Sequence, residues 1–192
     1  MGSIIIYIWS LAGMAVSAEE RALVCARAYV GAAGVKGAGA LFGAKQPTIA
    51  RGRGGKPYFS SIPNLHFSLS HSGDYCACAY YIQPIGLDLQ IHAECRREAI
   101  ARRCFHPDEY AYLQSGGFKD FFRVWATKES YVKYTGAGIA GGLDKFCVVC
   151  NGDLKNAMDG VEFYRAEEPE GYSLCLCAAS IQEVRVECLS HL

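Results

Sequence analysis

Residues 85–90 read Ile85-Gly86-Leu87-Asp88-Leu89-Gln90, a run in which aliphatic residues alternate with others. Successive side chains of a strand point to opposite faces, so the three aliphatic residues share one face. The other face then carries Gly86, Asp88 and Gln90, a carboxylate beside a carboxamide with space left by the glycine. Oxygen ligands of this kind suit a hard cation such as Mg²⁺. The same pattern also fits an aspartate on a solvent-exposed strand face, which is the commoner situation.

Helices and further strands are expected on both sides of this run. Glycine breaks, turn residues and apolar patterning predict helices over residues 18–33, 93–103 and 118–134, and another that begins at Pro107. Strands are expected from Ile4 onward and over residues 65–69, 75–82, 145–150, 161–166, 172–179 and 183–189. Helices among mostly adjacent strands indicate an α+β fold with antiparallel sheets. Both halves run strand, helix, strands, which predicts two units, residues 1–83 and 84–192.

The composition limits the kind of protein. With 192 residues, 51% hydrophobic and 20% charged, the chain can bury a core and is typical of soluble globular proteins. Its 19 basic and 19 acidic residues cancel, so we expect no nucleic-acid partner, and phosphate recognition must come from a local cluster. The apolar stretch from Ile4 to about Val16 is short for a membrane span, and no Lys or Arg precedes Arg21, as a signal peptide would require. We expect a first core strand there and no membrane association.

Ten cysteines are scattered along the chain. Two Cys-x-Cys pairs, at 76/78 and 175/177, lie in strand-like runs, where this spacing puts both thiols of a pair on one face. Cys147 and Cys150 have a metal-like spacing, but no second cysteine pair or histidine pair accompanies them. We therefore expect buried thiols in a reducing cytoplasm, and no zinc centre built on this pair.

The helix predicted over residues 118–134 carries Trp125, Glu129 and Lys133 at intervals of four, so the three side chains lie along one stripe. The stripe has two interpretations. It fits an ordinary amphipathic helix with a Glu–Lys pair. It also fits a helix that brings Glu129 to a metal beside Asp88 and Lys133 to a phosphate. Spacing alone leaves both interpretations open.

Two further stretches offer groups that bind anions. Ser70-His71-Ser72-Gly73-Asp74 places hydroxyls and an imidazole at the end of a strand. Residues 51–57, RGRGGKP, combine two guanidiniums and an ammonium with flexible glycines, which suits phosphate but also fits a solvated basic loop. A hydrolase that uses His71 is a weaker alternative, because the sequence lacks the G-x-S-x-G of such enzymes.

The order of these stretches is more specific than any one of them. They resemble the motifs of the Sfp-type phosphopantetheinyl transferases, which follow the patterns GKP, F-x-x-SHS, G-x-D-x-E, F-x-x-x-E and W-x-x-KE-(A/S)-x-x-K. The resemblance covers residues 51–146. The matching segments are Gly55-Lys56-Pro57, Phe67–Asp74, Ile85–Gln90, Phe105–Tyr110 and Trp125–Lys133.

The resemblance implies a fold, a ligand and a set of site residues. The fold is a pseudodimer of two similar α+β halves, each an antiparallel sheet with packed helices, and coenzyme A binds in the cleft between them. Asp88 and Glu129 would be Mg²⁺ ligands, with Gln90 at the third position of the metal motif. The residues that the resemblance assigns to coenzyme A are Arg51, Arg53, Gly55, Lys56, Pro57, Ser70, His71 and Lys133.

The implied reaction transfers 4'-phosphopantetheine from coenzyme A to a carrier-protein serine and releases 3',5'-ADP. Glu129 is the expected base, directly or through a water, Lys133 would stabilise the leaving-group side, and Asp88 would act through the metal. One position departs from the family pattern, because Gln90 stands where a glutamate is usual. An amide oxygen can coordinate a cation but carries no charge. A coenzyme A binding protein that has lost the chemistry is therefore the alternative.

The expected partner is an apo acyl or peptidyl carrier protein that is acidic around its serine. The basic run Arg96, Arg97, Arg102 and Arg103 would form a docking face, or simply a solvated helix face. The sequence leaves open whether the carrier serves fatty acid, polyketide, nonribosomal peptide or lysine biosynthesis. An internal pseudodimer completes its own cleft, so we expect a monomer.

Overall fold

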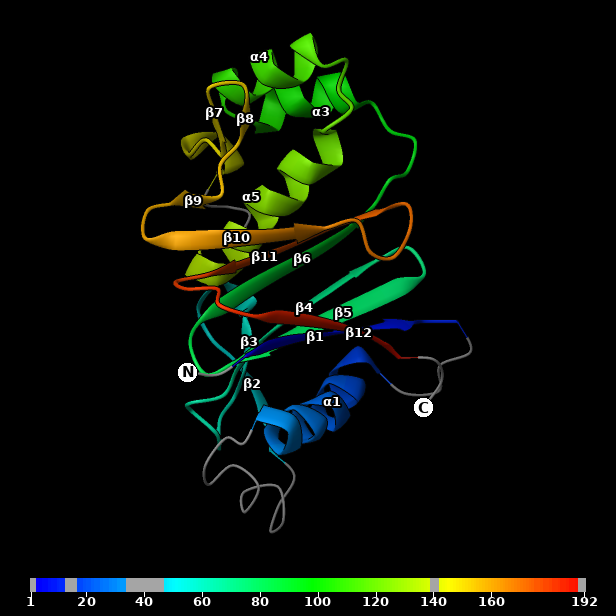
Figure 1. Ribbon diagram of the computed structural model, residues 1–192, viewed down its shortest axis with the longest axis vertical. Coiled ribbons are helices and arrows are strands. Elements are labelled where there is room, and N and C mark those ends of the chain that lie inside the picture. The colour runs from blue at the N-terminus through cyan, green and yellow to red at the C-terminus, as the bar shows by residue number, and fades with distance from the viewer. Residues whose placement is uncertain (1–2, 13–16, 34–46, 139–141, 190–192) are drawn as a thin grey trace.

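Two four-stranded sheets pack face to face, and helices cover their outer faces (Figure 1). A computed structural model describes residues 3–12, 17–33, 47–138 and 142–189, apart from the Arg53 side chain. Helix α1 (Ala18–Ala33) covers the first sheet, and α3 (Arg97–Cys104), α4 (Pro107–Ser115) and α5 (Phe121–Thr135) lie on the side of the second. The predicted α+β fold is confirmed. Among the described residues, no helix has the length and apolar character that crossing a membrane requires.

The first sheet has the strand order β12-β1-β5-β4. Its strands are β12 (Val184–Leu189), β1 (Ile4–Ser10), β5 (Tyr75–Tyr81) and β4 (His66–Ser72). Strand β1 is buried on both faces, with Ile4, Ile6 and Ile8 toward the second sheet and Tyr7 and Trp9 toward α1. The expectation of a first core strand is confirmed. Strands β1 and β12 pair in parallel, unlike the predicted antiparallel sheets. Parallel strands need a long connection, and the two segments lie near opposite ends of the described chain, so adjacent strand patterns did not indicate this pair.

The second sheet is antiparallel and has the order β6-β11-β10-β9. Its strands are β6 (Ile85–Ile91), β11 (Tyr172–Ala178), β10 (Val161–Ala166) and β9 (Ala157–Met158). As predicted, Ile85, Leu87 and Leu89 share one face, which packs in the core between the two sheets. Helix α5 packs on the opposite face, so Asp88 lies beneath it and is only 5% exposed. The interpretation of Asp88 as a solvent-facing residue is therefore wrong.

A row of serines joins the two sheets along their neighbouring edges. Three alternate residues of β4 present hydroxyl groups to the backbone of β6, in place of the carbonyl groups of a regular ladder. Ser68 Oγ accepts from Leu87 N at 2.9 Å, Ser70 Oγ accepts from Leu89 N at 3.1 Å, and Ser72 Oγ accepts from Ile91 N at 3.1 Å. These side chains satisfy backbone donors that a buried sheet edge would otherwise leave unpaired.

Some boundaries and short elements differ from the prediction. The strand expected over residues 145–150 is instead a single 3₁₀ turn, η3 (Leu143–Lys145), followed by the two-residue strand β7 (Val149–Cys150). The helix expected from Phe118 begins at Phe121, because Phe118 has φ 58° and cannot continue a right-handed helix. The short elements that were not predicted are β2 (Ile49–Arg51), η1 (Arg53–Gly55), β3 (Pro57–Phe59), β8 (Asp153–Leu154) and β9.

All ten cysteines are free thiols. Both Cys-x-Cys pairs are buried, on β5 and β11, as the strand-like spacing predicts. Cys95, Cys150 and Cys188 are exposed. The division of the chain at residues 83–84 into two similar halves stays a prediction, and β12, which follows this boundary, lies in the same sheet as β1.

Gly86 sets how closely α5 approaches β6. A Cβ atom at this position would lie 2.0 Å from the carbonyl oxygen of Ser130 and 2.4 Å from the amide nitrogen of Tyr134, both backbone atoms of α5. We expect Gly86→Ala to cost about 3 kcal/mol or more of folding stability, because the helix must move away from the sheet. Urea unfolding measures this loss, with Gly31→Ala as the control, because a Cβ atom there would meet nothing within 4 Å and the residue is helical. Equal losses in the two variants would contradict the close approach.

Candidate active site

Asp88 of β6 and Glu129 and Lys133 of α5 meet where the helix crosses the sheet. The Lys133 ammonium donates hydrogen bonds to Asp88 Oδ1 at 2.7 Å and to Ser70 Oγ at 2.8 Å. Ser70 Oγ donates to Asp88 Oδ1 at 2.9 Å and accepts from Leu89 N at 3.1 Å. The predicted stripe along α5 therefore reaches the aspartate of β6, and the Asp88 carboxylate is held through one of its two oxygens.

Two carboxylate oxygens at this point have no hydrogen-bond partner among the described residues. They are Asp88 Oδ2 and Glu129 Oε1, and both are buried. Burial raises the pKa of Asp88, although the Lys133 ammonium opposes the effect. Burial, followed by the charge of Asp88, raises the pKa of Glu129 to about 6, again against the influence of Lys133. A cation bound to these neighbouring oxygens would relieve both the desolvation and the repulsion.

A pocket of about 330 Å³ opens beside Glu129 and Lys133. The loop of η1 and β3, strand β4 and the end of α5 contribute its other walls. Of the residues that the sequence assigns to coenzyme A, the pocket also includes Gly55, Lys56 and Pro57. The sequence-based prediction missed the lining residues Gly54, Ser68, Leu69, Val132, Gly136 and Gly138.

Gly54 and Gly136 both line this pocket and approach each other closely. Gly136 follows α5 with φ 70°, and Gly54 has φ 64°, a backbone region that favours glycine. A Cβ atom on Gly54 would lie 2.4 Å from the carbonyl oxygen of Gly136, so glycine is also required for space. From the sequence, Gly136 could be recognised only as a helix stop and Gly54 only as part of a flexible loop.

The Lys56 ammonium ties this loop to the rest of the site. It donates to the carbonyl oxygens of Ile85 at 2.8 Å and Tyr134 at 3.3 Å. An ammonium has three donors, so one is left for an anion in the pocket. Burial lowers the pKa of Lys56 to about 8, which leaves the group mostly charged at neutral pH. A phosphate bound beside it would favour the charged form further.

Arg51, Ser70 and His71, which the sequence also assigns to coenzyme A, are not among the pocket-lining residues that the structure describes. Arg51 forms an ion pair with Glu19 of α1 and donates to Gly55 O at 3.2 Å. His71 is exposed, and it points to the face of β4 opposite Ser70. The Arg53 side chain lies outside the described residues. The contact of these residues with coenzyme A stays a prediction.

Gln90 shares the Asp88 face of β6 and is half-buried. Its side-chain Nε2 donates to Ile91 O at 3.3 Å, a local contact. The amide oxygen is the atom that a cation would use. The assignment of Gln90 as a third metal ligand stays a prediction.

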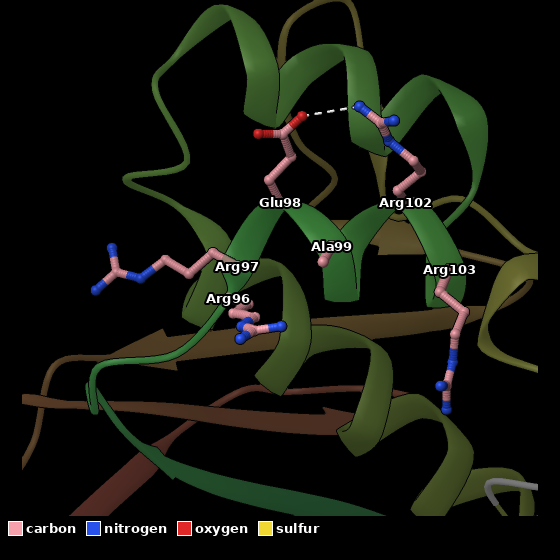
Figure 2. A pocket seen from close by; sticks show the side chains of 6 residues that line it. All are labelled: Arg96, Arg97, Glu98, Ala99, Arg102 and Arg103. Atoms are coloured by element: carbon pink, nitrogen blue, oxygen red, sulfur yellow. Dashed lines mark hydrogen bonds and ion pairs between the residues drawn. The ribbon is translucent and has the colours of Figure 1, made fainter.

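The basic run that was predicted to dock a partner or face solvent lies on and beside α3 (Figure 2). Arg102 pairs with Glu98 at 2.8 Å. Arg96 and Arg103 extend on the other side of the helix, away from this pair (Figure 2). They line a hollow over the surface of α3 together with Arg97, Ala99 and the Glu98–Arg102 pair. The geometry thus separates a neutralised edge of α3 from an edge that carries cations.

Comparisons with known proteins agree with this arrangement. Residues 84–177 match the sequence profile of the 4'-phosphopantetheinyl transferase superfamily. A 4'-phosphopantetheinyl transferase of Bacillus subtilis is 37% identical over 135 residues, which is 65% of this chain and 60% of the relative. The 4'-phosphopantetheinyl transferase psf-1 of Bacillus pumilus is 42% identical over 96 residues, or 48% of this chain and 41% of the relative. The 4'-phosphopantetheinyl transferase HetI of Nostoc is 44% identical over 82 residues, which is 40% of this chain and 35% of the relative.

This chain spans only part of the length of the Bacillus subtilis relative. The chain matches 60% of its length. The profile match, at residues 84–177, contains β6 and α5 and therefore both buried carboxylates. Residues 84–177 of this chain therefore belong to the 4'-phosphopantetheinyl transferase superfamily.

Proposed function

We propose that this chain transfers the 4'-phosphopantetheine arm of coenzyme A to a serine of an apo acyl or peptidyl carrier protein, with Mg²⁺, and releases 3',5'-ADP. The observation that carries the proposal is the pair of buried, unpartnered oxygens, Asp88 Oδ2 and Glu129 Oε1. Glu129 lines a pocket together with Lys56 and Lys133, and Lys133 is hydrogen-bonded to Asp88. Relatives that are named 4'-phosphopantetheinyl transferases support the same activity.

The donor set fits Mg²⁺. Asp88 and Glu129 supply the hard, charged oxygens that this ion prefers, and Gln90 and water would complete the site. When bound, Mg²⁺ would offset the charge that develops on the pyrophosphate of coenzyme A. Lys133 and Ser70 both donate hydrogen bonds to Asp88 Oδ1, so Asp88 Oδ2 is left for the cation.

Glu129 is the proposed base. A serine hydroxyl is a weak nucleophile and needs a group that accepts its proton. A carboxyl with a pKa of about 6 is mostly ionised at neutral pH and is more basic than an ordinary glutamate. It would act directly or through a water, with the oxygen that is not bound to the cation. Lys133 would stabilise charge on the pyrophosphate, and Lys56, with Arg51 or Arg53, would hold the 3'-phosphate end.

A transfer assay tests this function. The protein is incubated with coenzyme A, Mg²⁺ and a panel of apo carriers from fatty acid, polyketide, nonribosomal peptide and lysine pathways. We expect at least one carrier to gain the mass of one phosphopantetheine arm, and we expect the gain to disappear without Mg²⁺. Measurable binding of coenzyme A without transfer to any carrier would refute the enzyme and favour a binding protein.

Ser70 provides a test of how Asp88 is positioned. Its hydroxyl has one donor and two acceptor sites, and Asp88, Leu89 and Lys133 occupy all three. We expect Ser70→Ala to lower kcat roughly 10- to 100-fold, the effect of losing a hydrogen bond to a charged group. The apparent affinity for Mg²⁺ should fall as well. Ser72→Ala, which removes the next hydroxyl of the same row, should change neither, and equal losses in both variants would contradict the positioning role.

The cationic edge of α3 is the proposed docking face for an acidic carrier. Reversing the charge with Arg103→Glu should raise KM for the carrier roughly tenfold and leave kcat unchanged, because complementary charge acts mainly on encounter. The effect should shrink at high salt. Arg185→Glu, on the exposed strand β12, is the matched control. A fall in kcat, or an equal rise in KM for the control, would contradict docking at α3.

We also propose that the chain acts as a monomer in the reducing cytoplasm. An internal pseudodimer, as the resemblance implies, would complete the coenzyme A cleft without a second chain. The ten free thiols suit a compartment that keeps cysteines reduced. Light scattering at working concentrations, with and without coenzyme A, checks the oligomeric state, and a dimer in both conditions would refute the monomer.

A further inference from the structure

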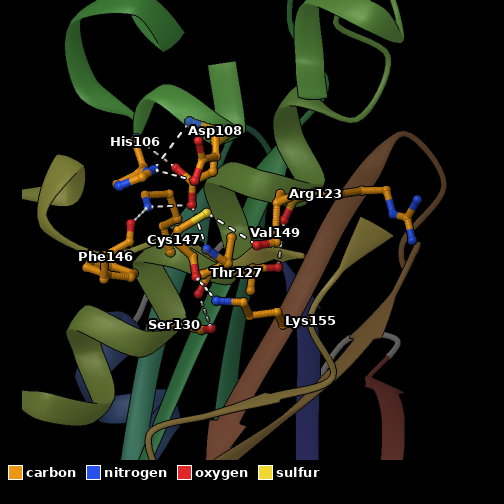
Figure 3. Close-up of polar contacts among 12 residues, drawn as sticks. His106, Asp108, Arg123, Thr127, Ser130, Phe146, Cys147, Val149 and Lys155 are labelled. Carbon is orange, nitrogen blue, oxygen red and sulfur yellow. Dashed lines mark hydrogen bonds and ion pairs between the residues drawn. The ribbon is translucent and has the colours of Figure 1, made fainter. Parts of the chain in front are cut away.

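A cluster of metal-binding side chains lies outside the pocket. His106 and Asp108, at the start of α4, meet Cys147, which precedes β7 (Figure 3). One possible ligand atom from each lies within 4.8 Å of the other two. Among the residues that the structure describes, no other group of three or more His, Cys, Asp or Glu side chains is placed in this way. We propose that this His–Asp–Cys cluster binds a zinc-class divalent cation through imidazole, carboxylate and thiolate.

One buried carboxylate holds the two ligand-bearing segments together. Glu109 is fully buried, and it accepts from the backbone nitrogen of His106 at 3.0 Å and from that of Val148 at 2.7 Å. Val148 directly follows Cys147 in the chain. The carbonyl oxygen of Cys147 accepts from Lys155 Nζ at 2.8 Å. His106 and Cys147 therefore cannot separate unless buried hydrogen bonds break. The backbones that carry two of the ligands are thus fixed before a metal arrives, as supporting residues do in known metal sites.

The side chains are close to a binding arrangement and need only small movements. His106 Nδ1 lies 3.5 Å from Asp108 Oδ2 and accepts from Asp108 N at 3.3 Å, a capping bond that a metal on Nδ1 would replace. Cys147 Sγ donates to Val149 O at 3.3 Å. Bonds from zinc to its ligands are about 2.0–2.3 Å long, so the three atoms must draw together by roughly an ångström. Rotation can supply this, because His106 and Cys147 are half-buried and Asp108 is exposed. The thiol loses its proton to solvent when the sulfur binds the metal, so affinity rises with pH.

The chemistry of the cluster selects the metal. A thiolate and an imidazole favour zinc, cobalt and similar ions over Mg²⁺, which prefers oxygen ligands. The carboxylate and the thiolate together balance the charge of a divalent ion. Of the two lysines close to Cys147, Lys128 is already neutralised by Glu109 at 2.7 Å, and the Lys155 ammonium donates to Cys147 O. Three protein ligands leave a fourth position for water or another small ligand.

This site differs from the one that the Cys-x-x-Cys spacing brings to mind. Cys150 is exposed and does not belong to the cluster, and the other ligands come from α4. The sequence analysis expected no zinc centre built on Cys147 and Cys150, and the proposed site does not use Cys150. The ligands His106 and Asp108 are two residues apart, and their link to Cys147 exists only in three dimensions.

Cobalt titration tests the proposal. The full chain, with its thiols reduced, is titrated with Co²⁺ in saturating Mg²⁺, and the near-ultraviolet band of sulfur–cobalt charge transfer is followed. We expect a one-to-one complex that Zn²⁺ displaces. Cys147→Ser should abolish the band, and His106→Asn, which can still cap α4, should weaken Co²⁺ binding roughly tenfold or more.

Cys150→Ser is the matched control, because this cysteine is close in sequence but absent from the cluster. It should keep the band and the affinity. No charge-transfer band, or an equal loss in Cys147→Ser and Cys150→Ser, would overturn the proposal. The readout is spectroscopic and independent of phosphopantetheine transfer, so this result and the proposed function stand or fall separately.

Discussion

Glu129→Gln will abolish phosphopantetheine transfer and at the same time stabilise the metal-free protein at neutral pH. The substitution removes the proposed base and one of two charged metal ligands, so we expect a loss of roughly 1000-fold or more in kcat. It also removes a charge that the fold disfavours, because Glu129 is buried beside Asp88. Glutamine has nearly the same volume, so packing is kept. Loss of activity with a gain in stability is the signature of a site selected for function rather than for stability.

The direction of the stability change follows from the pKa. In the folded protein the pKa of Glu129 is about 6, above its ordinary value of 4.5. Below pH 4.5 the group is protonated in both states, and its contribution to stability is fully present. That contribution is lost as the pH rises from 4.5 through 6, because the unfolded state ionises more easily. The difference corresponds to about 2 kcal/mol above pH 6, which glutamine avoids.

Urea unfolding at pH 4.5 and pH 7, without Mg²⁺, measures this difference. The wild type and Glu129→Gln should be similar in stability at pH 4.5, and the variant should be the more stable of the two at pH 7. Added Mg²⁺ should stabilise the wild type more than the variant, because the ion binds the folded carboxylates. Glu170→Gln, at an exposed position, should behave as the wild type. A variant that is less stable than the wild type at pH 7 would contradict the burial of an unpaired carboxylate.

Lys128→Met will destabilise the fold by about 3–5 kcal/mol, because it leaves a buried carboxylate without its counter-ion. Lys128 and Glu109 are both fully buried and form an ion pair at 2.7 Å. The ammonium also donates to Phe146 O at 2.6 Å and lies 4.0 Å from the centre of the Phe146 ring. This pair links α5 to α4 and to the segment that leads into β7.

The double variant Lys128→Met/Glu109→Gln tests whether Lys128 and Glu109 stabilise the fold as a pair or independently. Both charges are then absent, and the glutamine oxygen can still accept from a backbone donor. We expect the double variant to lose less stability than the sum of the two single variants, a coupling that chemical unfolding can resolve. Additive losses would show that the two groups act independently and would refute the pair as the main link.

The sequence was sufficient for features that depend on local pattern. Alternation over Ile85–Gln90 predicted which residues of β6 face the core, and intervals of four along α5 predicted the shared stripe of Glu129 and Lys133. The burial of Asp88 was not predictable in this way, because it depends on α5 packing over Gly86. Local pattern describes one element at a time, whereas burial depends on which elements meet.

Long-range contacts account for the residues whose surroundings were misjudged or missed. The contact of Ser70 with coenzyme A stays a prediction, whereas the bonds of its hydroxyl to Leu89, Asp88 and Lys133, which come from two other elements, were not predicted. Gly54 was seen only as a flexible residue, and its contact with Gly136 became visible in three dimensions. The contacts of Ser70 and Gly54 join residues that are far apart in the sequence, and no periodic pattern of residues indicates them.

The parallel pairing of β1 with β12 has a consequence for how the protein is made. Ile4 pairs with Val184, so one edge of β1 stays open until almost all of the described chain has left the ribosome. Contacts between such distant segments slow folding, because a long loop must close before they form. Until then the apolar strand β1 presents an unpaired edge, which is the kind of segment that joins other chains. Yield in a cell should therefore depend on chaperones that shield this strand during synthesis.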